Sequence, residues 1–350
     1  MKKILFSIFF TFFVFVSYAQ KNGEKYNIRT LAFYNLENLF DTINNPNKND
    51  EASPIMKLKN NKSKVYWDKL NKLGSVISQI GFDKTKTGPA IIGVCEVENK
   101  AVLEDLVQSK FLKDMNYEII HYESPDKRGI DVALLYQKKY FTPTNHQSFT
   151  PNIYKDGYRV FTRDQLLVSG YLDDELIHVI VNHWPSRRGG EAKSSFLREK
   201  AAYQNVKIIE SIKDKQAKAK IFVMGDFNDN PTNASLKKVL KTKGKKKKVK
   251  KNNLYNPYEK LFKNGTGTLT YRDNMFLFDQ IMFSSWVLDK GKKDYSSYKM
   301  YKAKIFNKPF LTEKKGKYKG YPFRSFSYGQ YTGGFSDHYP VYIYLIKEVK

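Results

Sequence analysis

Six short motifs rich in Asn, Asp, Glu and His are spread along the chain, and most of them follow a run of apolar or β-branched residues. In chain order they are Asn35-Leu36-Glu37-Asn38, Cys95-Glu96-Val97-Glu98-Asn99, Asn182-His183-Trp184-Pro185-Ser186, Gly225-Asp226-Phe227-Asn228-Asp229, Phe278-Asp279-Gln280 and Ser336-Asp337-His338. Polar residues that directly follow buried strands lie on loops held by a rigid sheet, where catalytic side chains are commonly found. Each motif alone is a weak signal, but the ordered set predicts one metal-dependent site that hydrolyses phosphodiesters.

The acidic residues of these motifs suit a hard divalent cation. Such cations bind oxygen ligands, and Mg²⁺ is typically held by one or two carboxylates while waters and a substrate phosphate complete its shell. The chain offers these oxygens at six separated positions: Glu37, Glu96, Asp226, Asn228, Asp279 and Asp337. No CxxC pair and no HExxH motif indicates a zinc cluster. The sequence therefore predicts a magnesium-type site.

Hydrolysis of a phosphodiester needs an activated water, a neutralised phosphoryl group and help for the leaving oxygen. A histidine paired with a carboxylate can activate the water, and His338 is the leading candidate. Asp279 lies in the apolar run Leu277-Phe278-Asp279-Gln280-Ile281-Met282, where a carboxylate needs a partner. We therefore predict that Asp279 orients His338 and stabilises its charge.

Other polar residues could contact the phosphate. Asn228 can donate to a phosphate oxygen or position the water, and His183 can donate or act as an acid. Arg163 and Arg187 are candidates for a bidentate phosphate contact. Each also has an ordinary structural explanation, because Gly-Asp-Phe-Asn-Asp is common turn chemistry and His183 could be a half-buried structural histidine.

The elements that would position these motifs follow from the apolar patterns. Strands are expected at 28–34, 89–95, 117–122, 132–136, 165–172, 176–182, 221–224, 276–283 and 341–346, and helices at 65–80, 99–107 and 191–212. Paired strand runs between long helices favour two antiparallel-rich sheets packed together with helices outside, over a doubly wound sheet. Motifs lie on both sides of the one linker-like segment, so we expect a single domain over residues 20–350.

The first 19 residues have the features of a cleaved signal peptide. Lys2 and Lys3 precede an apolar stretch at 4–16, and Ser17-Tyr18-Ala19 offers a small-x-small cleavage pattern. The apolar stretch is short compared with the ~20 residues of a membrane span. We therefore expect an exported protein, periplasmic or secreted. Cys95 is the only cysteine, so the chain must be stable without an intramolecular disulfide, and a buried core thiol is expected.

The charge is strongly positive, at +26 from 61 basic and 35 acidic residues. Such an excess favours a polyanionic partner, either nucleic acid or an anionic membrane surface. Residues 237–253 are predicted to be a lysine-rich loop, with ten lysines between 237 and 251, and residues 290–324 combine basic residues with five tyrosines. Basic and aromatic side chains together suit phosphate contact and base stacking, although the lysine loop could simply be solvated. Nothing implies a protein partner, so a monomer is expected.

Taken together, the motifs resemble those of the endonuclease/exonuclease/phosphatase superfamily, over about residues 28–346. Asn35-Leu36-Glu37 is similar to the motif that follows the family's first strand. Glu96 is similar to the family's metal-binding glutamate. Two later family motifs are similar to Gly225-Asp226-Phe227-Asn228 and Ser336-Asp337-His338. The resemblance implies a DNase I-like fold, a four-layer α-β-β-α sandwich, and a Mg²⁺- or Mn²⁺-dependent phosphoesterase. It implies three groups of site residues: metal ligands Asn35, Glu37, Glu96 and Asp337; catalytic residues His183, Asp226, Asn228, Asp279 and His338; and phosphate-binding residues Arg163, Ser186 and Arg187.

Members of this superfamily act on DNA, RNA, inositol phosphates and sphingomyelin, so the resemblance does not give the substrate. The mixture of tyrosine and lysine at 290–325 favours a nuclease. The alternatives are a lipid or small-molecule phosphodiesterase or phosphatase of the same fold, sphingomyelinase-like, and a non-catalytic nucleic-acid or surface-binding protein. Exposed hairpin tips rich in Trp and Phe would favour the lipid alternative.

Overall fold

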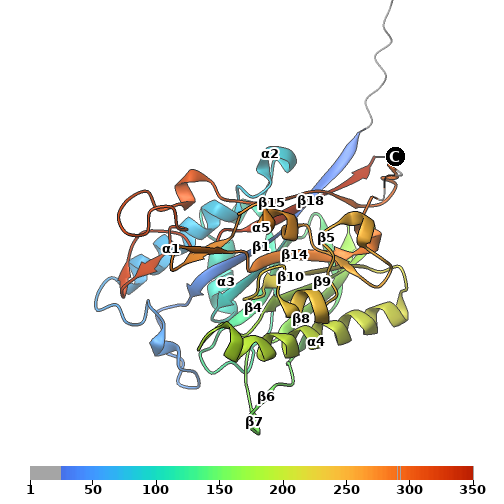
Figure 1. Ribbon diagram of the computed structural model, residues 1–350. Coiled ribbons are helices and arrows are strands. Elements are labelled where there is room, and N and C mark those ends of the chain that lie inside the picture. The colour runs from blue at the N-terminus through green and yellow to red at the C-terminus, as the bar shows by residue number, and fades with distance from the viewer. Residues whose placement is uncertain (1–24, 290, 292, 350) are drawn as a thin grey trace, which may run out of the picture.

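Two β-sheets of six strands each pack face to face, and helices cover their outer faces (Figure 1). This computed structural model describes residues 25–289, 291 and 293–349. The predicted signal peptide at 1–19 lies outside the described residues. The four layers confirm the predicted α-β-β-α sandwich.

The two sheets have the same pattern of strand directions. The first sheet has the order β15-β18-β1-β2-β4-β3. Its strands are β1 (Tyr26–Leu39), β2 (Ile91–Val97), β3 (Tyr117–His121), β4 (Asp131–Gln137), β15 (Lys299–Ile305) and β18 (Val341–Glu348). The second sheet has the order β11-β14-β10-β9-β8-β5. Its strands are β5 (Phe141–Phe149), β8 (Gln165–Leu172), β9 (Glu175–His183), β10 (Lys220–Asp226), β11 (Leu254–Tyr255) and β14 (Asp279–Ser284). Each sheet has one parallel pair near its centre, β1 with β2 and β10 with β9, and its other pairs are antiparallel.

Helices and small hairpins complete the fold. The α-helices are α1 (Lys62–Ile77), α2 (Phe82–Thr85), α3 (Lys100–Val107), α4 (Glu191–Lys215) and α5 (Tyr258–Lys263). Three hairpins lie outside the sheets: β6 (Tyr154–Lys155) with β7 (Tyr158–Arg159), β12 (Leu269–Tyr271) with β13 (Asn274–Phe276), and β16 (Phe326–Ser327) with β17 (Gln330–Tyr331). Short helical turns occur at Asp50–Ala52, Lys113–Met115, Ser235–Val239, Lys246–Lys248, Ser285–Val287 and Pro309–Leu311. Within the described residues, no helix has the length and apolar character needed to cross a membrane.

Apolar residues on both faces of the central strands build the layers. In β1, Leu31 and Phe33 face the cluster between the sheets, while Ala32 and Tyr34 face the cluster beneath α1 and α3. This alternation is the two-residue period of a strand. A third cluster lies between the second sheet and α4. The central strands are therefore buried on both sides, and only their ends are free to present polar residues.

Helix α3 begins where the sequence predicts. Asn99 has an extended backbone, and its side-chain Oδ1 accepts the backbone N–H of Val102 over 3.0 Å. This contact satisfies one of the N–H groups that a helix leaves unpaired at its start. Because α3 follows the Glu96 motif directly, the cap also fixes how the chain leaves the end of β2.

Replacing Asn99 by alanine should lower the free energy of unfolding by about 1 kcal/mol, because the cap is removed. Asn99→Ser can still accept the Val102 N–H and should stay close to the wild type. Urea unfolding of both variants tests this expectation. Equal destabilisation in both would show that the cap is not what the asparagine contributes.

Buried residues anchor the lysine-rich loop: Val239, Leu240 and Thr242 near its start, and Val249 further along. Val249 is buried and belongs to the cluster between the sheets, whereas residues 245–248 are exposed. Lys237 pairs with Glu259 of α5 over 2.8 Å. The loop therefore presents lysines to solvent from a fixed base.

Candidate active site

The register of the two sheets brings the motifs to one edge, where both parallel pairs end. Asp226, at the end of β10, lies opposite His183 of β9 and Asp279 of β14. In the first sheet, Asn35 of β1 lies opposite Cys95 of β2. The two sheets meet at this edge, because Nδ2 of Asn35 donates to Oδ2 of Asp226 over 3.2 Å.

Four motif residues hold an unusual backbone conformation. Their φ angles are positive: Glu37 (48°), Asn38 (48°), Glu96 (60°) and Asn228 (49°). Residues other than glycine adopt this region rarely, and they persist in it where the surrounding structure holds them, often at functional sites. The concentration of such residues at one edge supports the assignment of this edge as the active site.

His338 and Asp279 form a buried pair. Nδ1 of His338 lies 2.7 Å from Oδ2 of Asp279. Ser336 fixes the loop, because its Oγ donates to the Asn35 carbonyl and accepts the backbone N–H of His338. Burial alone would lower the pKa of His338, but the Asp279 carboxylate raises it well above its usual value. The imidazole is therefore held in its charged form at neutral pH.

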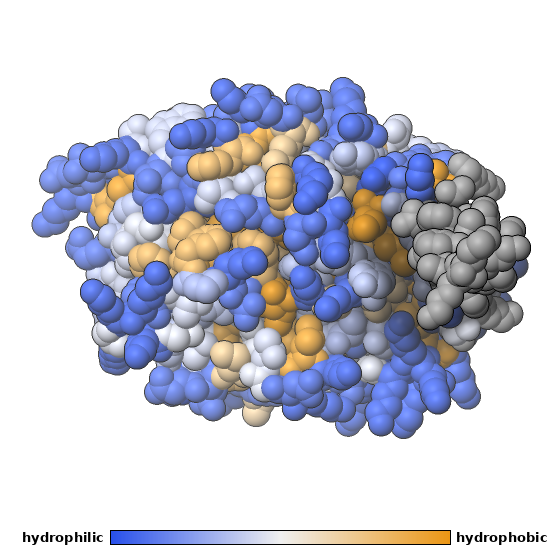
Figure 2. Space-filling view, turned by 90° about the horizontal axis from the view of Figure 1, so that it is seen from above, coloured by the Kyte–Doolittle hydropathy of each residue, from blue (hydrophilic) through white to orange (hydrophobic). Residues whose placement is uncertain are grey.

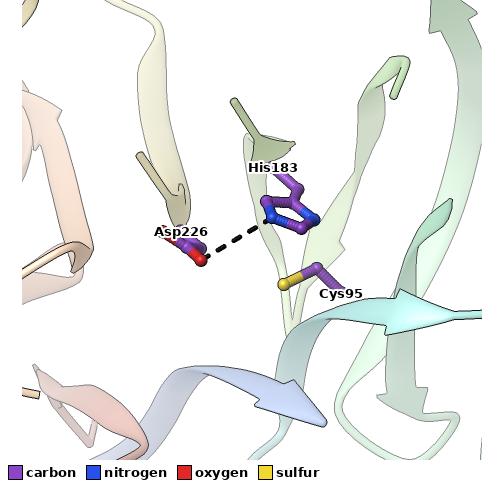
Figure 3. Close-up of side chains that lie close together, drawn as sticks. All are labelled: Cys95, His183 and Asp226. Atoms are coloured by element: carbon purple, nitrogen blue, oxygen red, sulfur yellow. Dashed lines mark ion pairs between the residues drawn. The ribbon is translucent and has the colours of Figure 1, made fainter. Parts of the chain in front are cut away.

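Asp226 lies at the centre of the site. Its Oδ2 is 3.7 Å from Nε2 of His183 (Figure 3) and 4.0 Å from Nε2 of His338. Burial raises the pKa of Asp226 to about 7, although the nearby His338 opposes this shift. A carboxylate with a pKa near neutrality can accept a proton from water, whereas a charged imidazole cannot. Asp226 is therefore a candidate for the base and charged His338 for a hydrogen-bond donor, while activation of the water by His338 stays a prediction of the sequence.

His183 and Cys95 line the same part of the site (Figure 3). Burial, followed by the charges of Arg163 and Arg128, lowers the pKa of His183 well below its usual value, so this imidazole is neutral. With Asp226, the two residues are close enough to hold a metal ion. However, burial raises the pKa of the Cys95 thiol well above its usual value, and only a thiolate is a good ligand. Cys95 therefore remains a core thiol.

Glu96 presents a partly exposed carboxylate to the site. Its Oε1 accepts Nδ2 of Asn35 over 3.1 Å, and its Oε2 accepts the backbone N–H of Asn38 over 2.9 Å. Oδ1 of Asn35 accepts the backbone N–H of Glu37. The amide nitrogen of Asn35, and not its oxygen, thus faces Glu96 and Asp226. Asn35 was expected to be a metal ligand, but in this structure it positions the two carboxylates.

Glu37 and Asp337 were also expected to be metal ligands, and both face Arg324. Nε of Arg324 is 3.2 Å from Oε1 of Glu37, and Nη2 is 3.2 Å from Oδ2 of Asp337. Oε2 of Glu37 accepts the N–H and the hydroxyl of Ser325, at 2.6 and 2.8 Å. Burial, and then Asp337, raise the pKa of Glu37 to about 7, while Lys69 and Arg324 oppose the shift. Both carboxylates are thus paired with Arg324.

Lys69 of α1 is buried beneath the same edge. Its ammonium donates to the carbonyl oxygens of Glu37 and Asn38. Burial lowers the pKa of Lys69 to about 8. These contacts hold the two residues of β1 that have positive φ angles. Sequence reasoning missed Lys69, because it is one lysine among many at helical spacing.

The carbonyl oxygen of Trp184 positions two predicted site residues. It accepts Nδ2 of Asn228 over 3.0 Å, and it accepts Nη2 of Arg163. Arg163 is buried, and its Nη1 also contacts Asp126. We predicted that Arg163 would contact the phosphate. The structure instead places its guanidinium beneath the loop that follows His183, where it supports the site.

Arg187 has its donors occupied by protein groups. Nε donates to the Asn228 carbonyl over 2.8 Å, Nη1 to Glu191 and Nη2 to Asp229. Nη2 also donates to Asn233 over 3.3 Å, so protein groups occupy four of the five N–H groups of Arg187. A bidentate phosphate contact by Arg187 stays a prediction, and it would require Arg187 to give up some of these contacts. Arg187 fixes the loop that carries Asn228. Ser186, in the same loop, is exposed.

Arg128 is a site residue that sequence reasoning did not assign. Its Nε and Nη2 donate to Asp126 at 3.0 and 2.9 Å, and half of its side chain is exposed. It lies close enough to lower the pKa of His183. The run Arg128-Gly129-Ile130-Asp131 before β4 was the only signal for it. Arg128 thus offers a partly exposed positive charge near His183.

The donor set fits one hard divalent cation. Glu96 and Asp226 supply carboxylate oxygens that share the Nδ2 donor of Asn35, and both lie within 4 Å of Nε2 of His183. Mg²⁺ and Mn²⁺ favour such oxygens, and one or two carboxylates suffice for Mg²⁺. The residues present therefore fit a bound ion with Glu96 as its principal ligand.

The fold and the site together define a phosphoesterase. The chain matches the model of the endonuclease/exonuclease/phosphatase family over residues 30–347, and it belongs to that family. No curated protein sequence matches the chain closely enough to count as a relative.

Solved structures share the fold at low sequence identity. A humanized D. rerio TDP2 is 14% identical with a TM-score of 0.54, over 91% of this chain and 98% of that chain. An endonuclease/exonuclease/phosphatase family protein from Bacteroides thetaiotaomicron is 16% identical with a TM-score of 0.53, over 93% and 98%. A mannosyl-6-phosphatase from Bacteroides thetaiotaomicron is 17% identical with a TM-score of 0.50, over 91% and 99%. These structures confirm the predicted fold, and the family model confirms the predicted superfamily.

Proposed function

We propose that the protein is an exported, divalent-metal-dependent phosphodiesterase that hydrolyses phosphodiester bonds of nucleic acids. The observation that carries the proposal is the convergence of the His338–Asp279 pair, Asp226 and Glu96 at one sheet edge. An acid, a base and a hard-oxygen ligand within one site are the groups that this hydrolysis requires.

The residues of the site divide the chemistry among them. Asp226 accepts a proton from the attacking water as the water oxygen bonds to phosphorus and the P–O bond to the leaving group breaks, and the leaving oxygen takes up a proton from solvent. His338, held charged by Asp279, donates a hydrogen bond to a phosphoryl oxygen as negative charge develops there. Neutral His183 donates to a second phosphoryl oxygen. A Mg²⁺ or Mn²⁺ ion bound at Glu96 would neutralise the phosphoryl charge.

Charge and aromatic residues support a nucleic-acid substrate. Both Arg128 and Arg324 lie at the site with part of their side chains exposed. Tyr271 is exposed on the β12–β13 hairpin, and Tyr328 is exposed in the turn between β16 and β17. The overall charge of the chain is +26. Exposed aromatics beside cations can stack bases and contact phosphates. One structural neighbour, a D. rerio TDP2, is described in complex with a single-strand DNA product.

The experiment that tests the function is an activity panel with the chain from Gln20 onward. Plasmid, linear DNA, RNA, sphingomyelin and inositol phosphates are each incubated with Mg²⁺, with Mn²⁺ and with EDTA. Cleavage of DNA or RNA that EDTA abolishes and Mg²⁺ restores would support the proposal. Full activity in metal-stripped buffer, or hydrolysis of sphingomyelin alone, would overturn it. Amino-terminal sequencing of the protein recovered outside the cytoplasm, beginning near Gln20, tests export.

A lipid or small-molecule phosphodiesterase is the second candidate. One observation favours it, because the β6–β7 hairpin projects from the body of the molecule (Figure 1) and exposes Tyr154, Tyr158 and Phe161. The face shown in Figure 2 is covered mainly by hydrophilic residues, with smaller hydrophobic patches among them. Binding of the protein to anionic vesicles, abolished in a Tyr158→Ser variant, would favour this candidate over the nuclease.

The lysine loop should act on binding and not on chemistry. Replacing the lysines at 245–248 by glutamine should reduce the slope of log affinity against log salt by ~0.7–0.9 for each phosphate group that the variant no longer neutralises. Nucleic-acid binding measured across a range of salt concentrations gives this slope. The matched control replaces four exposed lysines elsewhere, Lys84, Lys86, Lys138 and Lys139. Equal slopes in the wild type and the loop variant would mean that the loop only aids solubility.

A further inference from the structure

Arg324 lies where the sequence predicts a metal ion. It bridges the carboxylates of Glu37 and Asp337, and its side chain is 48% exposed toward solvent. We propose that the guanidinium of Arg324 takes the place of a second metal ion, so that the site binds one divalent cation, at Glu96. This inference rests on the metal dependence of the proposed function and deepens it.

The geometry matches a cation held by two acids. The Nε contact to Glu37 and the Nη2 contact to Asp337 both measure 3.2 Å. Because a guanidinium is planar and always charged in proteins, it satisfies two separate carboxylates without giving up its charge. A metal ion at the same place would have to displace this charge or approach it closely. Glu37 and Asp337 therefore do not fit as ligands for a hard cation while Arg324 is present.

The segment that carries Arg324 is built to hold it there. Ser325 donates from its N–H and its hydroxyl to Glu37, so the residue next to Arg324 is fixed to the same carboxylate. Thr332 donates its hydroxyl to the Arg324 carbonyl. A Cβ at Gly334 would lie 2.1 Å from that carbonyl oxygen, so the backbone can approach only because residue 334 is glycine.

The same segment is also tied to α1. The hydroxyl of Tyr331 donates to Asp68 over 2.6 Å, and Phe326 is buried with its ring 5.4 Å from the ammonium of Lys69. Arg324 thus lies just before an ordered hairpin, in a segment that is fixed on both sides. This segment supplies the cation, and its carboxylate partners are Glu37 of β1 and Asp337.

Glu96 remains free for the single metal ion. Its hydrogen bonds come from neutral donors, the amide of Asn35 and the backbone N–H of Asn38. Among the described residues, no lysine or arginine lies within ion-pair distance of Glu96. Arg324 contacts the carboxylate of Glu37, and Lys69 contacts its backbone carbonyl. Glu96 is thus available as the principal metal ligand, whereas Glu37 and Asp337 are paired with Arg324.

The test is the number of Mn²⁺ ions bound by each chain, measured by calorimetry and by the electron paramagnetic resonance signal of free Mn²⁺. The wild type should bind one ion. Arg324→Gln should gain a second, weaker site because Glu37 and Asp337 then have no guanidinium partner, and Arg324→Lys should keep one. The control is Arg159→Gln, on the β6–β7 hairpin, which should leave the count at one. Circular dichroism confirms that each variant is folded.

Each outcome either supports or overturns the inference that Arg324 takes the place of a second metal ion. Two ions in the wild type, or one in Arg324→Gln, would overturn the inference while leaving metal dependence in place. No bound ion in the wild type would overturn both the inference and the metal dependence of the proposed function. A second variant gives an independent check. Glu37→Gln should change the affinity for the first ion less than about fivefold, whereas removal of a true ligand costs at least ~10–100-fold. A decrease of that size in Glu37→Gln would show that Glu37 is a ligand.

Discussion

Replacing His338 by alanine is expected to lower kcat by ~10²–10³-fold, the range for removal of one hydrogen-bond donor that stabilises developing negative charge. The imidazole is held charged by Asp279 at 2.7 Å and faces Asp226 at 4.0 Å, so its removal takes away both a donor and a positive charge. Asp279→Asn should cause a comparable decrease, because the amide cannot stabilise the imidazolium. Steady-state hydrolysis at saturating metal measures both effects.

Because His338 and Asp279 act as one unit, their effects should not multiply. The double variant should be little slower than the slower single variant. Multiplicative decreases would show that the two residues act separately. His146→Ala is the matched control, since His146 is exposed and contacts Tyr122 away from the motifs. Its kcat should remain that of the wild type.

Replacing Glu96 by glutamine should weaken metal binding by at least ~10–100-fold, the decrease typical even of residues that only orient a ligand. Glutamine keeps the shape of the side chain and tolerates the backbone φ of 60° no worse than glutamate, so the fold should persist. What the variant lacks is the negative charge that a hard cation requires. Mn²⁺ affinity and activity at limiting Mg²⁺ should fall together.

Excess metal should restore part of the activity of Glu96→Gln, because the defect is in binding. Glu104→Gln is the control, since Glu104 is exposed and pairs with Lys100 on α3. An affinity for Mn²⁺ in Glu96→Gln equal to that of the wild type would exclude Glu96 as the principal ligand. It would also direct attention to Asp226.

The parts of the site that sequence could predict are those enforced by burial. Asp279 lies in an apolar strand, and a carboxylate there needs a partner, which the structure supplies as His338. Motifs that follow strands of two parallel pairs must reach the same sheet edge, so their meeting follows from fold class. The sequence could also predict the cap of α3 at Asn99, because capping depends only on residues that are neighbours in the chain.

The parts that sequence could not predict depend on which groups meet through long-range packing. Arg187 has the right chemistry for a phosphate, but its donors are used by Asp229 and the Asn228 carbonyl. The positive φ angles of Glu37 and Asn38 direct their carbonyl oxygens toward the buried ammonium of Lys69. The residue types alone do not predict this backbone conformation. Arg324 reaches Glu37 only after a hairpin far along the chain has folded onto α1.

The pairing of β1 with β18 has a consequence for when the protein becomes active. Tyr26 lies opposite Glu348, so β1, at the start of the described chain, can form this pair only when β18, at its end, is present. Pairings between such distant segments form late, because the loop they close is long. The hydrogen bond from Ser336 to the Asn35 carbonyl joins the same two regions inside the site. Until the segment that carries His338 and β18 has docked, β1 lacks its antiparallel partner and Asp279 lacks the imidazole that it contacts, so the last part of the described chain completes the site.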